Sequence, residues 1–221
     1  MTHLETELKQ LKTDMLEMFL IVITQLEKSK TALITHNKDL AREVKVNERR
    51  VNSFELKLDR DCENIIALFN PVAVDLRFVL ASLKINSNLE RIGDIAEGIA
   101  LYVIEFKLEP EKELLAVSRL TEMFETAIGI MQDVMSAFET EDTALARSVF
   151  EKDETLDEIN RKANEKVAEF IRSHPDRINQ ALYAISAIRK LERVGDQCKN
   201  IAEEIIFYIE AKVLKHKKQL K

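Results

Sequence analysis

The stretches LERIGD (residues 89–94) and LERVGD (residues 191–196) are near-copies of each other, 102 residues apart. A second pair of matching stretches joins Leu40-Ala41-Arg42 to Leu145-Ala146-Arg147, 105 residues further on. Self-similarity at a nearly constant offset indicates that one structural unit occurs twice. Each hexad lies in a run whose apolar residues recur every three or four positions, which is typical of a helix with one buried face.

The composition favours long helices. The chain has 221 residues, of which 46% are hydrophobic and 33% charged, so it has enough apolar material for a core. It contains only 4 Gly and 3 Pro, and the backbone therefore has few places to turn sharply. Two of those glycines, Gly93 and Gly195, lie inside the hexads, where they predict a close approach of helices.

Five breaks divide the chain into helices. Pro71, Pro110 and Pro175 mark three of them, and the helix-capping types Asn37 and Asp142 supply the other two. The sequence therefore predicts an all-α fold of two tandem three-helix bundles related by an internal repeat, with one bundle in residues 1–108 and the other in residues 109–221. The expected helices are residues 4–35, 38–69, 72–107, 111–140, 143–173 and 176–213.

Several classes of protein are excluded. No apolar stretch approaches the length of a membrane span, and the first residues, MTHLETELKQLK, lack the apolar region of a secretory signal. Cys62 and Cys198 fall in helical patterns, which predicts buried, reduced thiols in a cytosolic protein. A net charge of -6 argues against nucleic acid as a partner and allows cation binding.

Acidic pairs accompany the repeat. Each hexad carries two carboxylates four residues apart, and the preceding helix carries a second pair of oxygen-bearing side chains with the same spacing. The two pairs are separated from the turn between their helices by similar numbers of residues, so we expect them to lie side by side. Oxygen ligands at one level suit Mg, Mn, Fe or Zn, although an ordinary surface ion-pair network with Arg91 and Arg193 would explain the same residues. The candidate ligands are Glu48, Asn52, Glu90 and Asp94 in the first half and Asp153, Asp157, Glu192 and Asp196 in the second.

This combination resembles the PhoU family of phosphate-transport regulators. The resemblance is carried by the two hexads, by Asn200-Ile201-Ala202-Glu203 and by PVAVDLR at residues 71–77. It implies two three-helix bundles that bind multinuclear iron or zinc clusters, through Glu48, Glu90 and Asp94 in one site and Asp153, Asp157, Glu192 and Asp196 in the other. Asn52 stands where the family favours a carboxylate, which predicts weaker binding at the first site.

The resemblance also implies a biological role. A PhoU-type protein is a cytoplasmic homodimer that negatively regulates the phosphate-starvation response. It acts between the ATPase subunit of the phosphate ABC transporter and a sensor histidine kinase, and it reaches the membrane only through such partners.

Two alternatives remain open. A di-metal carboxylate enzyme would need Glu-x-x-His motifs, and none of His3, His36, His174 and His216 completes one, so we predict that the chain is not an enzyme. A helical adaptor without metal would use the acidic residues for solubility alone. The lysine-rich end, Lys212–Lys221, is predicted to be solvated.

Overall fold

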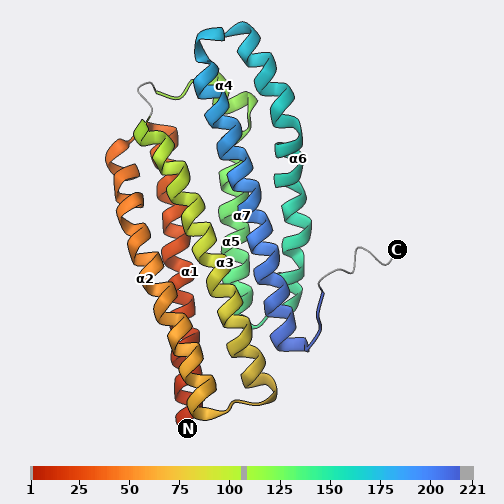
Figure 1. Cartoon of the computed structure of the whole chain (residues 1–221). Coiled ribbons are helices and arrows are strands. Elements are labelled where there is room, and N and C mark those ends of the chain that lie inside the picture. The colour runs from red at the N-terminus through yellow and green to blue at the C-terminus, as the bar shows by residue number, and fades with distance from the viewer. Residues whose placement is uncertain (1, 106–108, 215–221) are drawn as a thin grey trace.

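Six long helices form two antiparallel bundles that lie side by side (Figure 1). The computed structural model describes residues 2–105 and 109–214, and no strand occurs among them. The first bundle consists of α1 (His3–Thr35), α2 (Lys38–Phe69) and α3 (Ala73–Glu105); the second consists of α5 (Leu120–Thr140), α6 (Thr143–Ser173) and α7 (Ile178–Glu210). The prediction of an all-α fold built from two three-helix bundles is confirmed.

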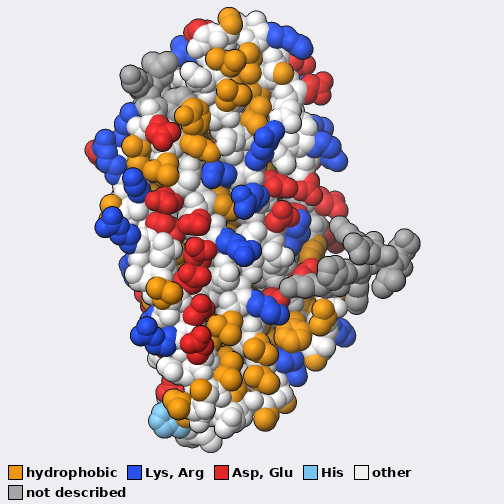
Figure 2. Space-filling model, viewed as in Figure 1, with side chains coloured by type: hydrophobic (Ala, Val, Ile, Leu, Met, Phe, Trp, Pro, Cys, Tyr) orange, Lys and Arg blue, Asp and Glu red, His pale blue; other side chains and the backbone are white. Residues whose placement is uncertain are grey.

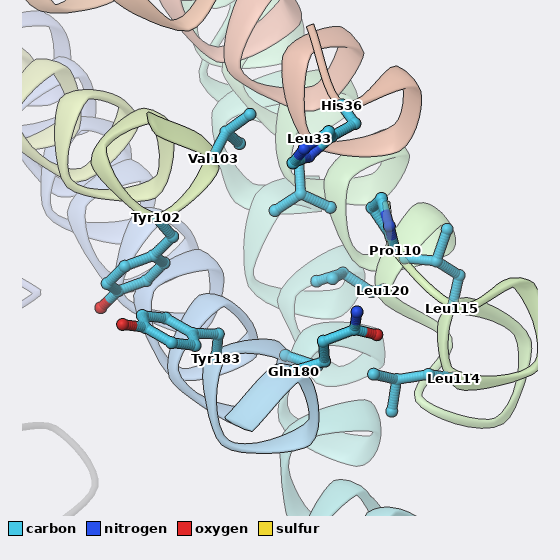
Figure 3. Close-up of a pocket in the computed structure, with 11 residues that line it drawn as sticks. Leu33, His36, Tyr102, Val103, Pro110, Leu114, Leu115, Leu120, Gln180 and Tyr183 are labelled. Carbon is cyan, nitrogen blue, oxygen red and sulfur yellow. The ribbon is translucent and has the colours of Figure 1, made fainter. Parts of the chain in front are cut away.

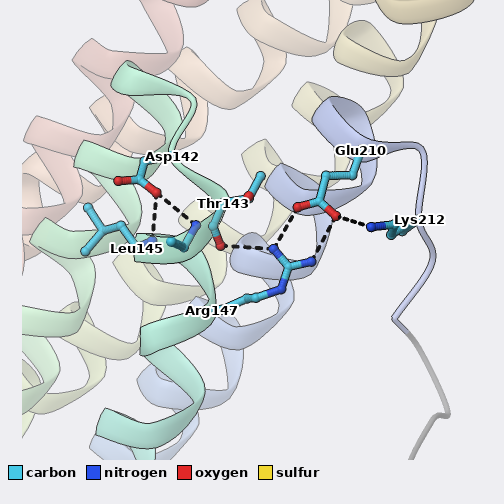
Figure 4. Close-up of polar contacts among 7 residues, drawn as sticks. Asp142, Thr143, Leu145, Arg147, Glu210 and Lys212 are labelled. Atoms are coloured by element: carbon cyan, nitrogen blue, oxygen red, sulfur yellow. Dashed lines mark hydrogen bonds and ion pairs between the residues drawn. The ribbon is translucent and has the colours of Figure 1, made fainter.

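Side-chain caps begin the middle helix of each bundle. The Asn37 side-chain oxygen accepts hydrogen bonds from the backbone amides of residues 39 and 40, at 3.1 and 3.0 Å. Asp142 accepts from the amides of residues 144 and 145, at 2.8 and 2.9 Å (Figure 4). One turn later, the Arg147 guanidinium forms two hydrogen bonds with Glu210, which joins the start of α6 to the end of α7. Both predicted breaks are therefore real helix starts.

The prediction of one helix over residues 111–140 is wrong. The structure has a short helix α4 (Lys112–Val117), and α5 begins only at Leu120. Arg119, between them, has a left-handed backbone with φ of 53°, and its guanidinium bonds Glu122 at 2.6 and 2.8 Å. Because Leu114 and Leu120 are both buried, the apolar pattern continues across the break and conceals it.

Two smaller differences concern the last helix. Its first turn is a 3-10 helix, η1 (Pro175–Arg177), and α7 ends at Glu210 because Ala211 takes a left-handed conformation with φ of 56°. Lys212, which follows, bonds Glu210 at 2.9 Å. Most of the predicted lysine-rich tail, residues 215–221, lies outside the described residues, and so do residues 106–108.

The two bundles share one hydrophobic core. α3 packs against α7, and α1 packs against α5. Between the bundles, the ring of Phe138 lies 5.6 Å from that of Phe19 and 6.0 Å from that of Phe78, centroid to centroid. Cys62 and Cys198 are buried free thiols, as predicted. Within residues 2–105 and 109–214, no helix has the length and apolar character needed to cross a bilayer.

Candidate metal-binding sites

In the first bundle, Gly93 of α3 makes room for a buried carboxylate on α2. A Cβ atom at residue 93 would lie 3.0 Å from Val51 Cγ1 and 3.1 Å from Glu48 Oε2, tighter than ordinary contact. Glu48 is only 4% exposed, and it lies against the backbone of α3 because the glycine has no side chain. The glycine in LERIGD therefore makes room for side chains of α2, namely Val51 and Glu48.

The Glu48 carboxylate is buried among other acids. Neither of its oxygens has a partner at full hydrogen-bond geometry in the described part of the chain, although the side-chain amide of Gln25 lies close enough to act as a donor that lowers its pKa. Burial raises the pKa of Glu48 from its ordinary 4.5 to about 7, and the charges of Asp94 and Glu97 act in the same direction. Burial also raises the pKa of Glu90, as do the charges of Asp94 and Glu55. The charge of Arg91 opposes the rise at Glu90, but burial and the neighbouring carboxylates outweigh it.

The second bundle repeats the arrangement with one difference. A Cβ at Gly195 of α7 would lie 2.1 Å from Asp153 Oδ1 and 2.7 Å from Leu156 Cδ1, so this position admits no larger residue without rearrangement. Asp153 of α6 is 2% exposed, and its Oδ1 has no partner among the described residues. Its Oδ2 forms an ion pair with Lys199, whose ammonium also lies 2.8 Å from Asp196 Oδ1. Burial raises the pKa of Asp153, while Lys199 opposes this rise.

Comparison with known proteins identifies the repeat. The PhoU domain matches the chain twice, over residues 15–103 and 120–205, and each range contains one of the two hexads. The chain belongs to the PhoU family.

Similar PhoU proteins match over nearly their whole length. The chain is 34% identical to the phosphate-specific transport system accessory protein PhoU homolog 1 of Thermotoga maritima, over 96% of this chain and 91% of that protein. It is 31% identical to the Escherichia coli accessory protein PhoU, over 95% and 86%. The crystal structure of PhoU from Pseudomonas aeruginosa superposes with a TM-score of 0.86 at 30% identity, covering 94% of this chain and 99% of that one. The resemblance drawn from the motifs is confirmed.

The PhoU repeats bring together most of the predicted ligands. The pKa of Glu192 is raised by burial and then by the charges of Asp196 and Asp157, so these residues share one neighbourhood with Asp153. Asn52 is exposed, and Glu55, also on α2, has a charge that raises the pKa of Glu90, while its own pKa is raised by burial and by the charges of Asp59 and Asp94. The residues that thus gather are Glu48, Glu55, Glu90, Asp94 and Glu97 in the first half and Asp153, Asp157, Glu192, Asp196 and Lys199 in the second.

At the arginines, the structure shows one charge effect but no direct contact: the charge of Arg91 lowers the pKa of Glu90 and so partly opposes the effect of burial. Arg91 and Arg193 are exposed, and neither forms an ion pair with another residue that the structure describes. Acidic side chains form a row over α2 and α3 and gather again over α6 and α7 (Figure 2). Surface arginines therefore do not neutralise these clusters through direct contacts.

Carboxylate oxygens are suitable ligands for a cation, although among the described residues they do not converge on a single point. Within residues 2–105 and 109–214, no group of three or more Asp, Glu, His or Cys side chains is arranged to hold a metal ion. However, Glu48 and Asp153 each present buried carboxylate oxygens without a partner, and an uncompensated buried charge is costly. The buried oxygens of Glu48 and Asp153 are therefore the observation that supports metal binding by the two clusters.

A separate cavity lies between the two bundles, near α4 (Figure 3). It has a volume of about 50 Å³, and its walls include four leucines together with Tyr102 and Tyr183. The Tyr102 hydroxyl lies 2.7 Å from that of Ser186. No candidate ligand lines this cavity, which has room for little more than water.

Proposed function

We propose that this PhoU-family protein is an accessory regulator of a phosphate-specific transport system. It acts in the cytoplasm as a homodimer and negatively regulates the phosphate-starvation response. Its partners are the ATPase subunit of a phosphate ABC transporter and a sensor histidine kinase, and it has no catalytic role. The observation that carries the proposal is the match of both repeats over 95% or more of the chain to proteins named as accessory proteins of phosphate-specific transport.

A complementation experiment tests this role. The chain is expressed in a bacterium that lacks its own PhoU protein, and a phosphate-starvation reporter is measured with phosphate in excess. We expect the reporter to be repressed, and we expect the purified chain to bind the ATPase subunit and the kinase in pull-down experiments. An abundant, folded chain that leaves the reporter active and binds neither partner would contradict the proposal.

The proposal includes iron or zinc in multinuclear sites, with Mg or Mn as alternative ions. In the first site the ion would be held by Glu48, Glu90 and Asp94. The second site would use Asp153, Asp157, Glu192 and Asp196. Two features support the proposal: the buried oxygens of Glu48 and Asp153 that lack partners, and the neighbouring carboxylates that raise the pKa of Glu48. When bound, the metal would supply positive charge, and the carboxylates would keep it between two helices of one bundle.

Metal analysis of protein purified without chelator tests the sites. We expect iron or zinc in the wild-type chain and its loss in the double variant Glu48→Gln/Asp153→Asn. The exposed Glu27→Gln serves as a matched control that retains metal. A chain without metal whose melting temperature is unchanged by iron or zinc would favour the metal-free adaptor, and oxygen consumption by iron-loaded protein would favour the enzyme.

A further inference from the structure

The two acidic sites differ in charge at one equivalent position. Three residues after Asp94 the chain has Glu97, whereas three residues after Asp196 it has Lys199. Both positions lie one turn beyond the hexad, on α3 and on α7, so the repeat places a negative group in one half and a positive group in the other.

Lys199 already acts as a cation between two helices. Its ammonium forms ion pairs with Asp153 of α6 and with Asp196 of α7, the latter at 2.8 Å. The side chain is 26% exposed, and the carboxylate of Asp153 that it reaches is almost fully buried, at 3%. An ammonium has one positive charge and three hydrogen-bond donors, so it satisfies two carboxylates at once.

The first site has no such group. Within the described ranges, no lysine or arginine lies at ion-pair distance from Glu48, Glu55, Glu90, Asp94 or Glu97. Both oxygens of Glu48 are buried without an ion pair, and the donor that acts on them is the neutral amide of Gln25, whereas one oxygen of Asp153 is paired with the Lys199 ammonium. Glu55 adds a carboxylate on α2 that compensates for the amide at Asn52.

We propose that Lys199 is the built-in counter-ion of the second site, so that a divalent cation binds preferentially at the first site. A cation entering the second site must displace the lysine from Asp153 and Asp196, whereas the first site offers carboxylates that no ammonium or guanidinium in the described ranges pairs with directly. This order is the reverse of the sequence-based prediction, in which the uncharged Asn52 makes the first site the weaker one. The inference rests on the metal sites of the proposed function.

Zinc binding to the purified full-length chain tests the order. The chain is stripped with chelator, equilibrated with zinc chloride and gel-filtered, and the zinc bound per chain is measured. We expect Asp94→Ala to lose more than half of the bound zinc and Asp196→Ala to lose less than half. Equal losses, a larger loss from Asp196→Ala, or a wild-type chain that binds no zinc would overturn the inference.

Exchanging the charges provides a reciprocal test. We expect Lys199→Gln to increase the zinc bound per chain and Glu97→Lys to decrease it, whereas Glu27→Lys, with the same charge change at an exposed site on α1, leaves it unchanged. Lys199→Met, which keeps the apolar stem, is the second variant should the glutamine disturb folding, as judged by circular dichroism. A Lys199→Met chain that folds without binding additional zinc would overturn the inference.

The outcome separates this inference from the proposed function. If zinc binds equally at both sites, metal binding stands and only the role of Lys199 fails. The reporter and pull-down experiments do not depend on which site holds the ion, so their failure would affect the regulatory role alone.

Discussion

Replacing Glu48 by glutamine should stabilise the metal-free protein at neutral pH. The glutamine keeps the shape of the side chain but has no charge to bury beside Asp94 and Glu97. The pKa of Glu48 rises from 4.5 to about 7 on folding. By linkage, this rise corresponds to about 3 kcal/mol of stability that is fully present below pH 4.5 and is lost as pH increases through 7. Glu48 is 4% exposed, so solvent does not screen this effect strongly.

Urea unfolding in the presence of chelator, from pH 4 to pH 8, measures this effect. We expect the stability of Glu48→Gln to equal that of the wild type at low pH and to exceed it by about 3 kcal/mol above pH 7, or about 6 to 12 °C in melting temperature. The control Glu27→Gln, at an exposed site, should show no such pH-dependent difference. Saturating zinc should stabilise the wild type more than the variant. If the difference in unfolding free energy between Glu48→Gln and the wild type stayed constant from pH 4 to pH 8, the conclusion that folding buries the charge of Glu48 would be wrong.

Three further predictions concern stability and are measured by urea unfolding. Gly195→Ala should destabilise the protein by about 1 to 3 kcal/mol and by more than Gly93→Ala, because the nearest atoms to the new Cβ lie at 2.1 Å and 3.0 Å respectively. Gly129→Ala, whose Cβ would have no atom within 4 Å, should stabilise the protein by about 1 kcal/mol. The opposite order of stabilities would contradict the packing. Phe138→Ala should destabilise by about 3 to 5 kcal/mol while leaving one unfolding transition, since this ring joins both bundles; two separate transitions would show that the core is divided. Asp142→Ala should destabilise by about 1 kcal/mol through loss of the α6 cap, and an unchanged stability would show that water replaces it.

The helix boundaries were predictable where a side chain carries the signal. Asn37 and Asp142 are of types that cap helices in any context, and both do so here. The break at Arg119 has no such signal, because neither glycine nor proline occurs there and the left-handed residue is an arginine. Leu114 and Leu120, on either side of the break, are both buried, and such burial is a property of the folded core.

The sequence predicted where along the helices the acidic clusters lie, but it did not predict every residue in them. Counting from the turns placed Glu48 beside the hexad of α3, because antiparallel helices of constant rise keep a fixed register. The same counting selected Asn52, which is exposed, and did not select Glu55, which lies seven residues after Glu48 on the same helix face and has a charge that raises the pKa of Glu90. Lys199 was missed because an ion pair between helices depends on how a long side chain is directed.

Both halves of the chain retain features that are unfavourable for stability alone. A glycine inside a helix is less favourable than alanine by about 1 kcal/mol, and a buried carboxylate without a partner is less favourable than an apolar residue of the same size. At Gly93 and Gly195 the two features require each other, since a Cβ would displace the carboxylates of Glu48 and Asp153. A positive charge between the helices would offset the cost of the buried carboxylate. The glycine would then be needed because it makes room for that carboxylate. In the second half Lys199 supplies that charge, so the unpaired oxygens of Glu48 are where an external cation would contribute most to the stability of the fold.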